Sequence, residues 1–343
     1  MKTALQSALL TFLFLLLSGT LSAQYSCNYI AYSASPNFTS SGQYMFMQSQ
    51  YNPGYVGWEN QPTWWVSAKR NTESTLGVRG NGSQFNLNWQ GQFPEWKSNL
   101  GVVFNYEQFN DNRGETSTNG TNGDRYDFKQ WKLGLQHNFM FDIGNGKAQA
   151  GFGVSLMKFA DIFTSNQGGL VNEYKFRPNV DVGLLAVFGN FEIGASVLHS
   201  NEPSFRDISA GFADRNAQFK RISYLQSSYE FQIGEMFYIK PNFMMRQLIG
   251  QGSINSCGVS IDAGVLFNLN DTVFASYSWG YHKQDYPHSV MVAYRLLSGY
   301  QISASMDISG NSGRERSRFE IGFGVYLFGE YYDDEEEETP EVR

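Results

Sequence analysis

Four histidines and two cysteines are the residues whose side chains most readily do chemistry: His137, His199, His282, His288, Cys27 and Cys257. The histidines lack the helical i, i+4 spacing of a zinc site, and no cysteine lies close to them in the sequence. His199 is followed by Ser200, and a Ser-His pair oriented by an acid could belong to a hydrolase, although a histidine at a strand end is the simpler interpretation. The sequence therefore predicts no metal site and no cofactor, and it favours a protein that is not an enzyme.

The remaining motifs and the overall charge exclude further classes. The chain has no phosphate-binding loop, no G-x-S-x-G motif and no dinucleotide fingerprint. Its net charge of -7 argues against a nucleic-acid partner, which would require a basic surface. Two cysteines far apart in the sequence do not make a disulfide framework, and whether Cys27 and Cys257 pair stays open.

The first residues predict export. Lys2 is followed by an apolar run over 8–17 and by the small residues Ser22 and Ala23, which is typical of a secretory signal peptide over 1–23. No later stretch approaches the roughly 18 uninterrupted apolar residues that a membrane-spanning helix requires. An exported chain without such a helix can still enter a membrane through strands.

Most of the mature chain alternates apolar with small or polar residues. In 318–328, Phe319, Ile321 and Phe323 point one way while Glu320 and Gly322 point the other, and this period of two indicates a strand with two unlike faces. A soluble sandwich and a membrane barrel both alternate in this way. The 28 Phe, 20 Tyr and 7 Trp residues favour the barrel, because aromatic girdles line both membrane interfaces.

The predicted fold is all-β, a transmembrane up-and-down antiparallel β-barrel in the cell outer membrane. We expect about fourteen strands, an even number as in bacterial barrels, near residues 63–71, 83–91, 98–108, 127–141, 148–160, 177–187, 191–199, 219–233, 236–247, 254–269, 272–282, 289–297, 300–308 and 318–328. Pro241 cannot donate a ladder hydrogen bond, so we expect a bulge or a local break at this residue.

The connections predict which end of the barrel faces the periplasm. Short connections, typical of periplasmic turns, cover 142–147, 188–190, 234–235, 270–271 and 298–299. Long polar connections, typical of the external side, cover 110–125, 161–176, 200–218 and 309–317. Both termini are then expected in the periplasm.

This pattern divides the chain into four parts. The signal peptide over 1–23 precedes a segment over 24–62 without a regular period, which we expect to form a plug or a periplasmic collar. The barrel follows over 63–328. The last part, 329–343, carries six consecutive acidic residues and is expected to be a solvated, disordered periplasmic tail.

Charged residues on the predicted inner faces are candidate lumen residues, because lipid would reject them. A basic residue near the bilayer midplane costs roughly 2 to 4 kcal/mol. The predicted lumen charges are Lys132, Asp181, Glu192, Glu230, Lys240, Arg246, Asp262, Arg295 and Glu320. They are interpreted as paired charges of a hydrated interior, with a substrate path as the alternative.

Several short stretches in order resemble the PorP/SprF family of outer-membrane proteins of Bacteroidetes, associated with type IX secretion and gliding motility. Residues 43–46 read Gln-Tyr-Met-Phe and are similar to the family's Q-Y-M-F. Residues 52–57 are similar to its N-P-A-Y-A-G, which makes Asn52, Pro53, Gly54, Tyr55 and Gly57 the candidate family motif. The resemblance continues through 178–183 and 191–196 to the final strand.

The resemblance implies a non-enzymatic barrel that helps a surface protein, often an adhesin, to be exported or held at the cell surface. Its implied partners are outer-membrane lipid, a secreted or surface-anchored protein and other type IX secretion components. The alternative that we keep is a passive pore or a channel for hydrophobic solutes, which uses the same shell.

Overall fold

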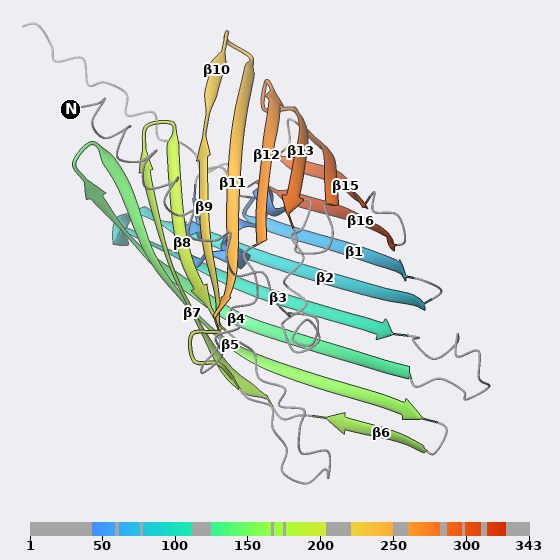
Figure 1. The fold of residues 1–343 in the computed structure, drawn as a ribbon. Helices are drawn as coiled ribbons and strands as arrows, with labels where there is room; N and C mark the ends of the chain where they lie inside the picture. Colours follow the sequence, from blue (N-terminus) through green and yellow to red (C-terminus); the bar gives the residue numbers. More distant parts are fainter. Residues whose placement is uncertain are drawn as a thin grey trace, which may run out of the picture.

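The computed structural model shows a closed ring of antiparallel strands around a short N-terminal segment (Figure 1). It describes residues 43–58, 62–75, 78–111, 125–165, 168–173, 176–203, 221–249, 260–281, 287–296, 299–309 and 314–326. The predicted signal peptide, Cys27, Cys257, His282 and the acidic tail lie outside these residues.

The strands follow the predicted order. They are β1 (Trp64–Thr75), β2 (Val78–Phe93), β3 (Ser98–Asp111), β4 (Arg125–Ile143), β5 (Gly146–Ser165), β6 (Gly168–Glu173), β7 (Arg177–Phe188), β8 (Phe191–Leu198), β9 (Arg221–Tyr229), β10 (Phe231–Ile233), β11 (Phe237–Ile249), β12 (Ser260–Leu269), β13 (Val273–Tyr281), β14 (Pro287–Arg295), β15 (Tyr300–Ser309) and β16 (Arg314–Val325). β10 continues β9 after Glu230, and β6 pairs only with β5 off the ring. The ring therefore has 14 strands, which confirms the predicted fold and count.

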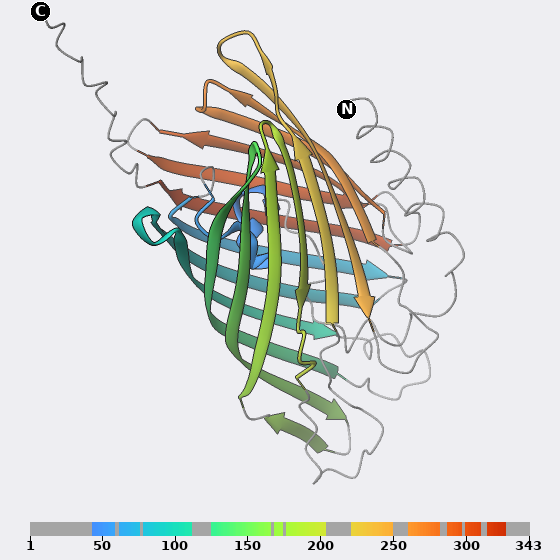
Figure 2. The same cartoon turned by 90° about the vertical axis from the view of Figure 1, so that its left-hand side faces the viewer.

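Hydrogen-bonded ladders close the ring. β1 pairs with β2 on one side and with β16 on the other, where Trp64 lies opposite Val325. β9 pairs with β8 and β11, which joins the two halves of the sequence. Because every strand of the ring has two neighbours, no ring strand presents an unpaired edge to lipid. The tilt of the strands makes the near and far walls cross in projection (Figure 2).

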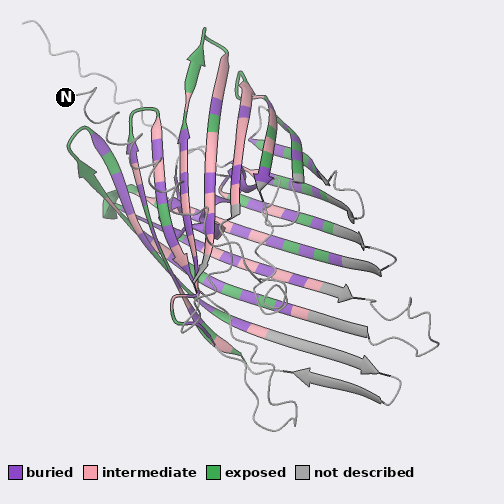
Figure 3. Ribbon diagram, in the orientation of Figure 1, coloured by how far each residue is buried: buried purple, intermediate pink, exposed green. Residues whose placement is uncertain are grey.

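The two faces of each strand differ as the alternation predicts, and the burial colours alternate along the strands (Figure 3). In β16, Phe319 and Ile321 are exposed, whereas Glu320 and Gly322 are buried. Further large apolar side chains on the outer surface include Leu135, Leu184, Val292 and Ile302. An outer surface of this kind suits hydrocarbon.

Six tight connections lie at one end of the barrel, which we call the short-turn end, whereas the ring connections at the opposite end vary from the short 76–77 to the long 199–220. The six tight connections are 94–97, 144–145, 189–190, 234–236, 270–272 and 296–299. Gly144 and Gly189 have φ of 56° and 58°, a left-handed conformation that glycine adopts without a steric penalty in such turns. β1 begins and β16 ends at this same end, as the pairing of Trp64 with Val325 shows.

Several strands extend further than predicted at the opposite end. The expected loop over 161–176 is wrong in part, because 161–165 belong to β5 and 168–173 form β6. The expected loops over 110–125 and 309–317 are likewise shortened. β4 has 19 residues, whereas about 9 to 11 suffice to cross a bilayer. Outside the bilayer, the outer face of a strand does not have to be apolar. The alternation of apolar and polar residues is therefore weaker there, although the backbone hydrogen bonds between strands continue.

The ladder between β9, β10 and β11 breaks at Pro241, as expected, but without a bulge. Ser228 lies opposite Asn242 and Phe231 lies opposite Ile239, so the register continues unchanged across the break. The backbone N-H of Glu230 instead donates to the carbonyl of Asn190, on the other side. Pro241 lacks an N-H, which explains the missing rung.

Residues 43–58, which we call the lumen segment, lie inside the ring (Figures 1 and 2). They form two 3-10 turns, η2 (Tyr44–Phe46) and η3 (Pro53–Tyr55), on either side of the single helical turn α2 (Gln48–Tyr51). Another 3-10 turn, η4 (Pro94–Trp96), joins β2 to β3. No helix among the described residues is long and apolar enough to cross a membrane.

Candidate functional site

The lumen segment fills space between the walls of the barrel. All of its residues except Gln50 are buried. η3 packs against β5 and β7, and to a lesser extent against β4 and β8. A segment of this length without regular secondary structure needs partners for its backbone polar groups when it is buried.

The candidate motif residues make close contacts with the wall. The Asn52 side chain donates to the Leu184 carbonyl at 2.9 Å and accepts from the Gly54 N-H at 2.8 Å. The wall opposite this turn consists of glycines: a Cβ on Gly151 would lie 2.5 Å from the carbonyl carbon of Pro53. Only residues without a side chain let the two backbones approach this closely.

The second half of the motif is fixed in the same way. The Gly57 N-H donates to Gln90 Oε1 at 2.8 Å, and Gly57 has φ of 68°. A side chain at Gly57 would collide with Asn99. Tyr55 is 1% exposed, and burial together with the nearby charge of Glu192 raises the pKa of its hydroxyl well above the usual value.

Amide side chains on β2, β3 and β4 hold the backbone carbonyls of the lumen segment. Asn138 and Asn99 both donate to the Val56 carbonyl, at 2.6 and 3.0 Å, and Gln136 donates to the Ser49 carbonyl at 2.8 Å. These amides are buried, and unpaired carbonyls at such a site would carry a desolvation penalty. These amides are not among the predicted lumen residues, because the prediction was made from charged side chains alone.

The opposite wall contacts the lumen segment mainly through apolar side chains, which the expectation of a polar interior did not foresee. Phe46 stacks on Trp65 with ring centroids 5.1 Å apart and meets Phe274 edge-on at 5.9 Å. The cluster continues through inward residues of β8, β9 and β11 to β14, namely Leu198, Ile222, Tyr224, Met244, Leu266, Met291 and Ala293. A filled lumen is a packed core, so apolar residues are stable on this inner face.

Six of the nine predicted lumen charges form three buried ion pairs. Lys132 Nζ lies 2.6 Å from Asp181 Oδ2, Lys240 Nζ lies 2.8 Å from Glu192 Oε1, and Arg246 Nη2 lies 2.7 Å from Asp262 Oδ2. Each pair joins different strands across the inner face. Mutual neutralisation is what permits charges to remain at buried positions.

The other three predicted charges occupy different surroundings. Glu320 is 1% exposed, and its backbone carbonyl accepts from Gln43 of the lumen segment at 3.1 Å. Arg295 is half-buried, with its guanidinium 3.8 Å from the ring centroid of Tyr326. Glu230 is half-buried at the short-turn end. The predicted charges do not include four further buried ones, Lys69, Glu107, Glu202 and Asp307. The same alternation that places Trp65 inward would have found Lys69.

His199 and Ser200 bind separate groups of the wall. The Ser200 hydroxyl donates to the Val180 carbonyl at 2.7 Å. His199 Nδ1 lies 2.7 Å from Asn179 Oδ1, and the His199 backbone N-H donates to Asp181 Oδ1 at 2.9 Å. These bonds tie the end of β8 to β7, a positioning role for a strand-end histidine.

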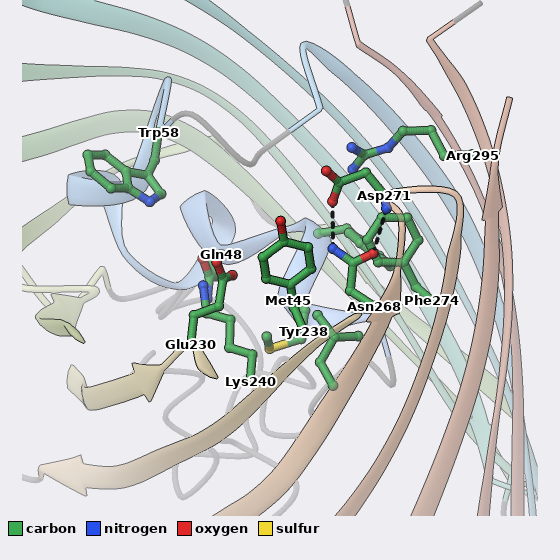
Figure 4. A pocket seen from close by; sticks show the side chains of 12 residues that line it. Met45, Gln48, Trp58, Glu230, Tyr238, Lys240, Asn268, Asp271, Phe274 and Arg295 are labelled. Carbon is green, nitrogen blue, oxygen red and sulfur yellow. Dashed lines mark hydrogen bonds between the residues drawn. The ribbon is translucent and has the colours of Figure 1, made fainter. Parts of the chain in front are cut away.

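A pocket of about 190 Å³ opens between the lumen segment and β11 to β14 (Figure 4). Its lining consists of Met45, Phe46, Gln48, Trp58, Glu230, Tyr238, Lys240, Leu266, Asn268, Asp271, Phe274 and Arg295. Asp271 belongs to the connection 270–272, so the pocket lies toward the short-turn end. It combines aromatic walls with charged side chains from two sides.

The profile of a protein family described as "Type IX secretion system membrane protein PorP/SprF" matches residues 34–325. No curated protein matches the chain. Among solved structures, the toluene transporter TbuX of Ralstonia pickettii superposes with a TM-score of 0.53 at 9% identity, covering 82% of this chain and 94% of that chain. The translocator domain of the autotransporter NalP from Neisseria meningitidis gives 0.47 at 9%, covering 83% and 96%.

Proposed function

The chain belongs to the PorP/SprF family of type IX secretion system membrane proteins, and from this premise we propose that it is a non-enzymatic, plugged outer-membrane barrel that assists the secretion or surface attachment of a partner protein such as an adhesin. The barrel fold and the family agree on the outer membrane as its location. The family suggests that membrane lipid and other type IX secretion components are its neighbours. The secreted or surface-anchored partner protein is our proposal.

The observation that carries the proposal is the lumen segment. A passive channel needs a continuous path, whereas here residues 43–58 are buried between the walls and bonded to them through Asn52, Asn99 and Asn138. These bonds end on backbone carbonyls of either the segment or the wall, so they fix the position of the chain more than that of individual side chains. A barrel closed in this way suits a docking role better than diffusion.

We assign the short-turn end to the periplasm, since tight connections are periplasmic in bacterial barrels. Both termini then lie on the periplasmic side, with 24–62 acting as a plug and 329–343 as a solvated acidic tail. The long connections and the extended strands β4 and β5 then face outward, where they form the surface that an exported partner would meet.

Two measurements on the purified full-length protein test the proposal. In planar bilayers or liposomes, we expect no steady conductance and no uptake of small apolar solutes by the unmodified protein. In detergent extracts of native outer membranes, we expect a secreted or surface-anchored protein to co-purify with it. A steady open pore without such a partner would instead favour the alternative, a passive pore or hydrophobic-solute channel.

A further inference from the structure

The pocket at the short-turn end has two chemically different ends. Figure 4 shows Glu230 and Lys240 at one end and Asp271, Phe274 and Arg295 at the other, with Tyr238 between them. Trp58 and Gln48 from the lumen segment lie on the side of Glu230. The two ends can therefore be considered separately.

At the second end, the charges already have partners. The guanidinium of Arg295 lies over two rings, 3.8 Å from the centroid of Tyr326 and 4.8 Å from that of Phe274. Its Nε donates to Gln301 Oε1 at 3.3 Å. The carboxylate of Asp271 accepts from Asn268 Nδ2 at 2.6 Å. Arginine stacked on aromatic faces is stabilised without a carboxylate.

At the first end, one negative charge remains in excess. Glu192 lies behind the lining, where its carboxylate accepts from Lys240 at 2.8 Å, from Ser228 at 2.9 Å and from Trp58 at 3.4 Å. Among the residues described at this end, the one ammonium, that of Lys240, is thus bound to Glu192. The carboxylate of Glu230 has no hydrogen-bond or ion-pair partner within the described part of the chain, although its residue is half-buried.

We propose that this pocket is a binding site for a basic side chain, arginine or lysine, presented by a peptide segment of a periplasmic protein. The cation would form a charge-assisted bond with Glu230 and contact two aromatic side chains of the lining, Trp58 on the side of Glu230 and Tyr238 between the two ends. It would neutralise the excess carboxylate. An anionic ligand would meet Glu230 and Asp271 and is disfavoured. The site goes beyond the proposed function, because it does not depend on which exported protein the barrel serves, and only its periplasmic side rests on the orientation proposed above.

Binding of three short peptides to the purified full-length protein in detergent tests the inference. The probes are acetyl-Gly-Arg-Gly-amide and its Gln and Glu counterparts, which differ only in the central side chain. Binding of each peptide is measured by ligand-observed NMR titration. We expect saturable, weak binding of the Arg peptide, with at least about tenfold weaker binding of the other two, because each loses a charge-assisted bond. Equal binding of the three peptides, or none, would overturn the inference.

Three variants with the same change of charge locate the site. Glu230→Gln should lower the affinity for the Arg peptide by about tenfold or more. Glu235→Gln, in the turn next to β11 and outside the pocket, and Asp271→Asn, at the other end of the pocket, should leave its affinity within about twofold. Equal losses for Glu230→Gln and Glu235→Gln, or a loss confined to Asp271→Asn, would contradict the site. If Glu230→Gln fails to fold, the selectivity of the unmodified protein among the three peptides still decides.

Discussion

At the scale of single residues, the buried ion pairs are expected to be costly to break. Arg246 is 0% exposed and its guanidinium lies 2.7 Å from Asp262. Arg246→Met removes the guanidinium that neutralises the buried carboxylate of Asp262, which should lower the free energy of unfolding by about 3 to 5 kcal/mol. Urea unfolding of the refolded barrel in detergent micelles measures this change. Replacing both partners, with Arg246→Met and Asp262→Leu together, should recover most of the loss, since neither of the two buried charges then remains.

The chain offers a matched exposed pair as a control. Lys97 Nζ lies 3.8 Å from Asp142 Oδ2, and their side chains are 72% and 75% exposed. Water screens this pair, so Lys97→Met should leave the unfolding curve unchanged within error. A loss for Lys97→Met equal to that for Arg246→Met would show that burial does not govern these interactions.

Tyr55 provides a residue-scale prediction on pH. Its hydroxyl pKa is raised well above 10.0, first by burial and then by the charge of Glu192. The buried state therefore favours the neutral phenol, and its contribution to stability is complete below about pH 10 and is lost as the pH rises toward the raised pKa. The difference in tyrosinate absorbance between the unmodified protein and Tyr55→Phe should show one group that ionises well above pH 10. A midpoint near pH 10 would mean that Tyr55 meets water.

At the scale of a strand, two neighbours on β16 separate the outer face from the inner one. Ile321 is 51% exposed on the outside, and Ile321→Arg places a charge toward hydrocarbon at a cost of roughly 2 to 4 kcal/mol if central. Gly322 points inward, where an added Cβ would lie 2.6 Å from Ser303 Oγ and collide with Gln43 and Trp65. An arginine there has no room, so it must displace the lumen segment.

The two substitutions should therefore fail in different ways. Ile321→Arg should reduce the yield of folded barrel in vesicles, measured by the shift between heated and unheated protein on gels. Gly322→Arg should keep this shift but expose residues 43–58 to protease. The same outcome for both variants would contradict the assigned faces of β16.

Strand by strand, the shell could be predicted from the sequence because a period of two is a local property. The residues next to Phe319 and Glu320 in the sequence are sufficient to predict which face of the strand each of the two occupies. The ends of β4 and β5 could not be predicted, since polar residues outside the bilayer pair as well as apolar ones. The contacts of the lumen segment depend on residues far apart in the chain: Asn138 and Val56 are separated by 82 positions, so no local pattern reveals that they meet. Of the candidate site, the charged residues could be predicted, whereas their partners and the amide side chains could not.

At the scale of the whole molecule, the two walls hold the lumen segment by different means. Amides of β2 to β4, including Gln92 of β2, which donates to the Gly57 carbonyl at 2.6 Å, fix the carbonyls of the segment, and the glycine-rich faces of β5 and β7 fix the turn at Pro53. The wall formed by β11 to β14 contacts it mainly through apolar side chains. Hydrogen bonds are directional and apolar contacts are not, so the position of the segment depends mostly on the first wall. A substitution that disturbs the first wall should therefore affect whether the lumen segment keeps the barrel closed.

Gly151→Ala on β5 tests this dependence, with Gly153→Ala as its control. The new Cβ at Gly151 would lie 2.5 Å from the Pro53 carbonyl carbon and 2.8 Å from the Gly54 nitrogen, both rigid backbone atoms. Overpacking of this kind costs roughly 1 to 3 kcal/mol, which shifts the segment's equilibrium toward displacement by about 5- to 150-fold. At Gly153, on the same face, the nearest atom is the Gln136 Cγ at 3.3 Å, which needs to give by only a few tenths of an ångström, so the Gln136 amide can keep its bond to the Ser49 carbonyl. We expect single-channel recordings to show frequent openings for Gly151→Ala, and as few for Gly153→Ala as for the unmodified protein. Equal behaviour of the two variants would mean that the contact between Pro53 and β5 does not keep the barrel closed.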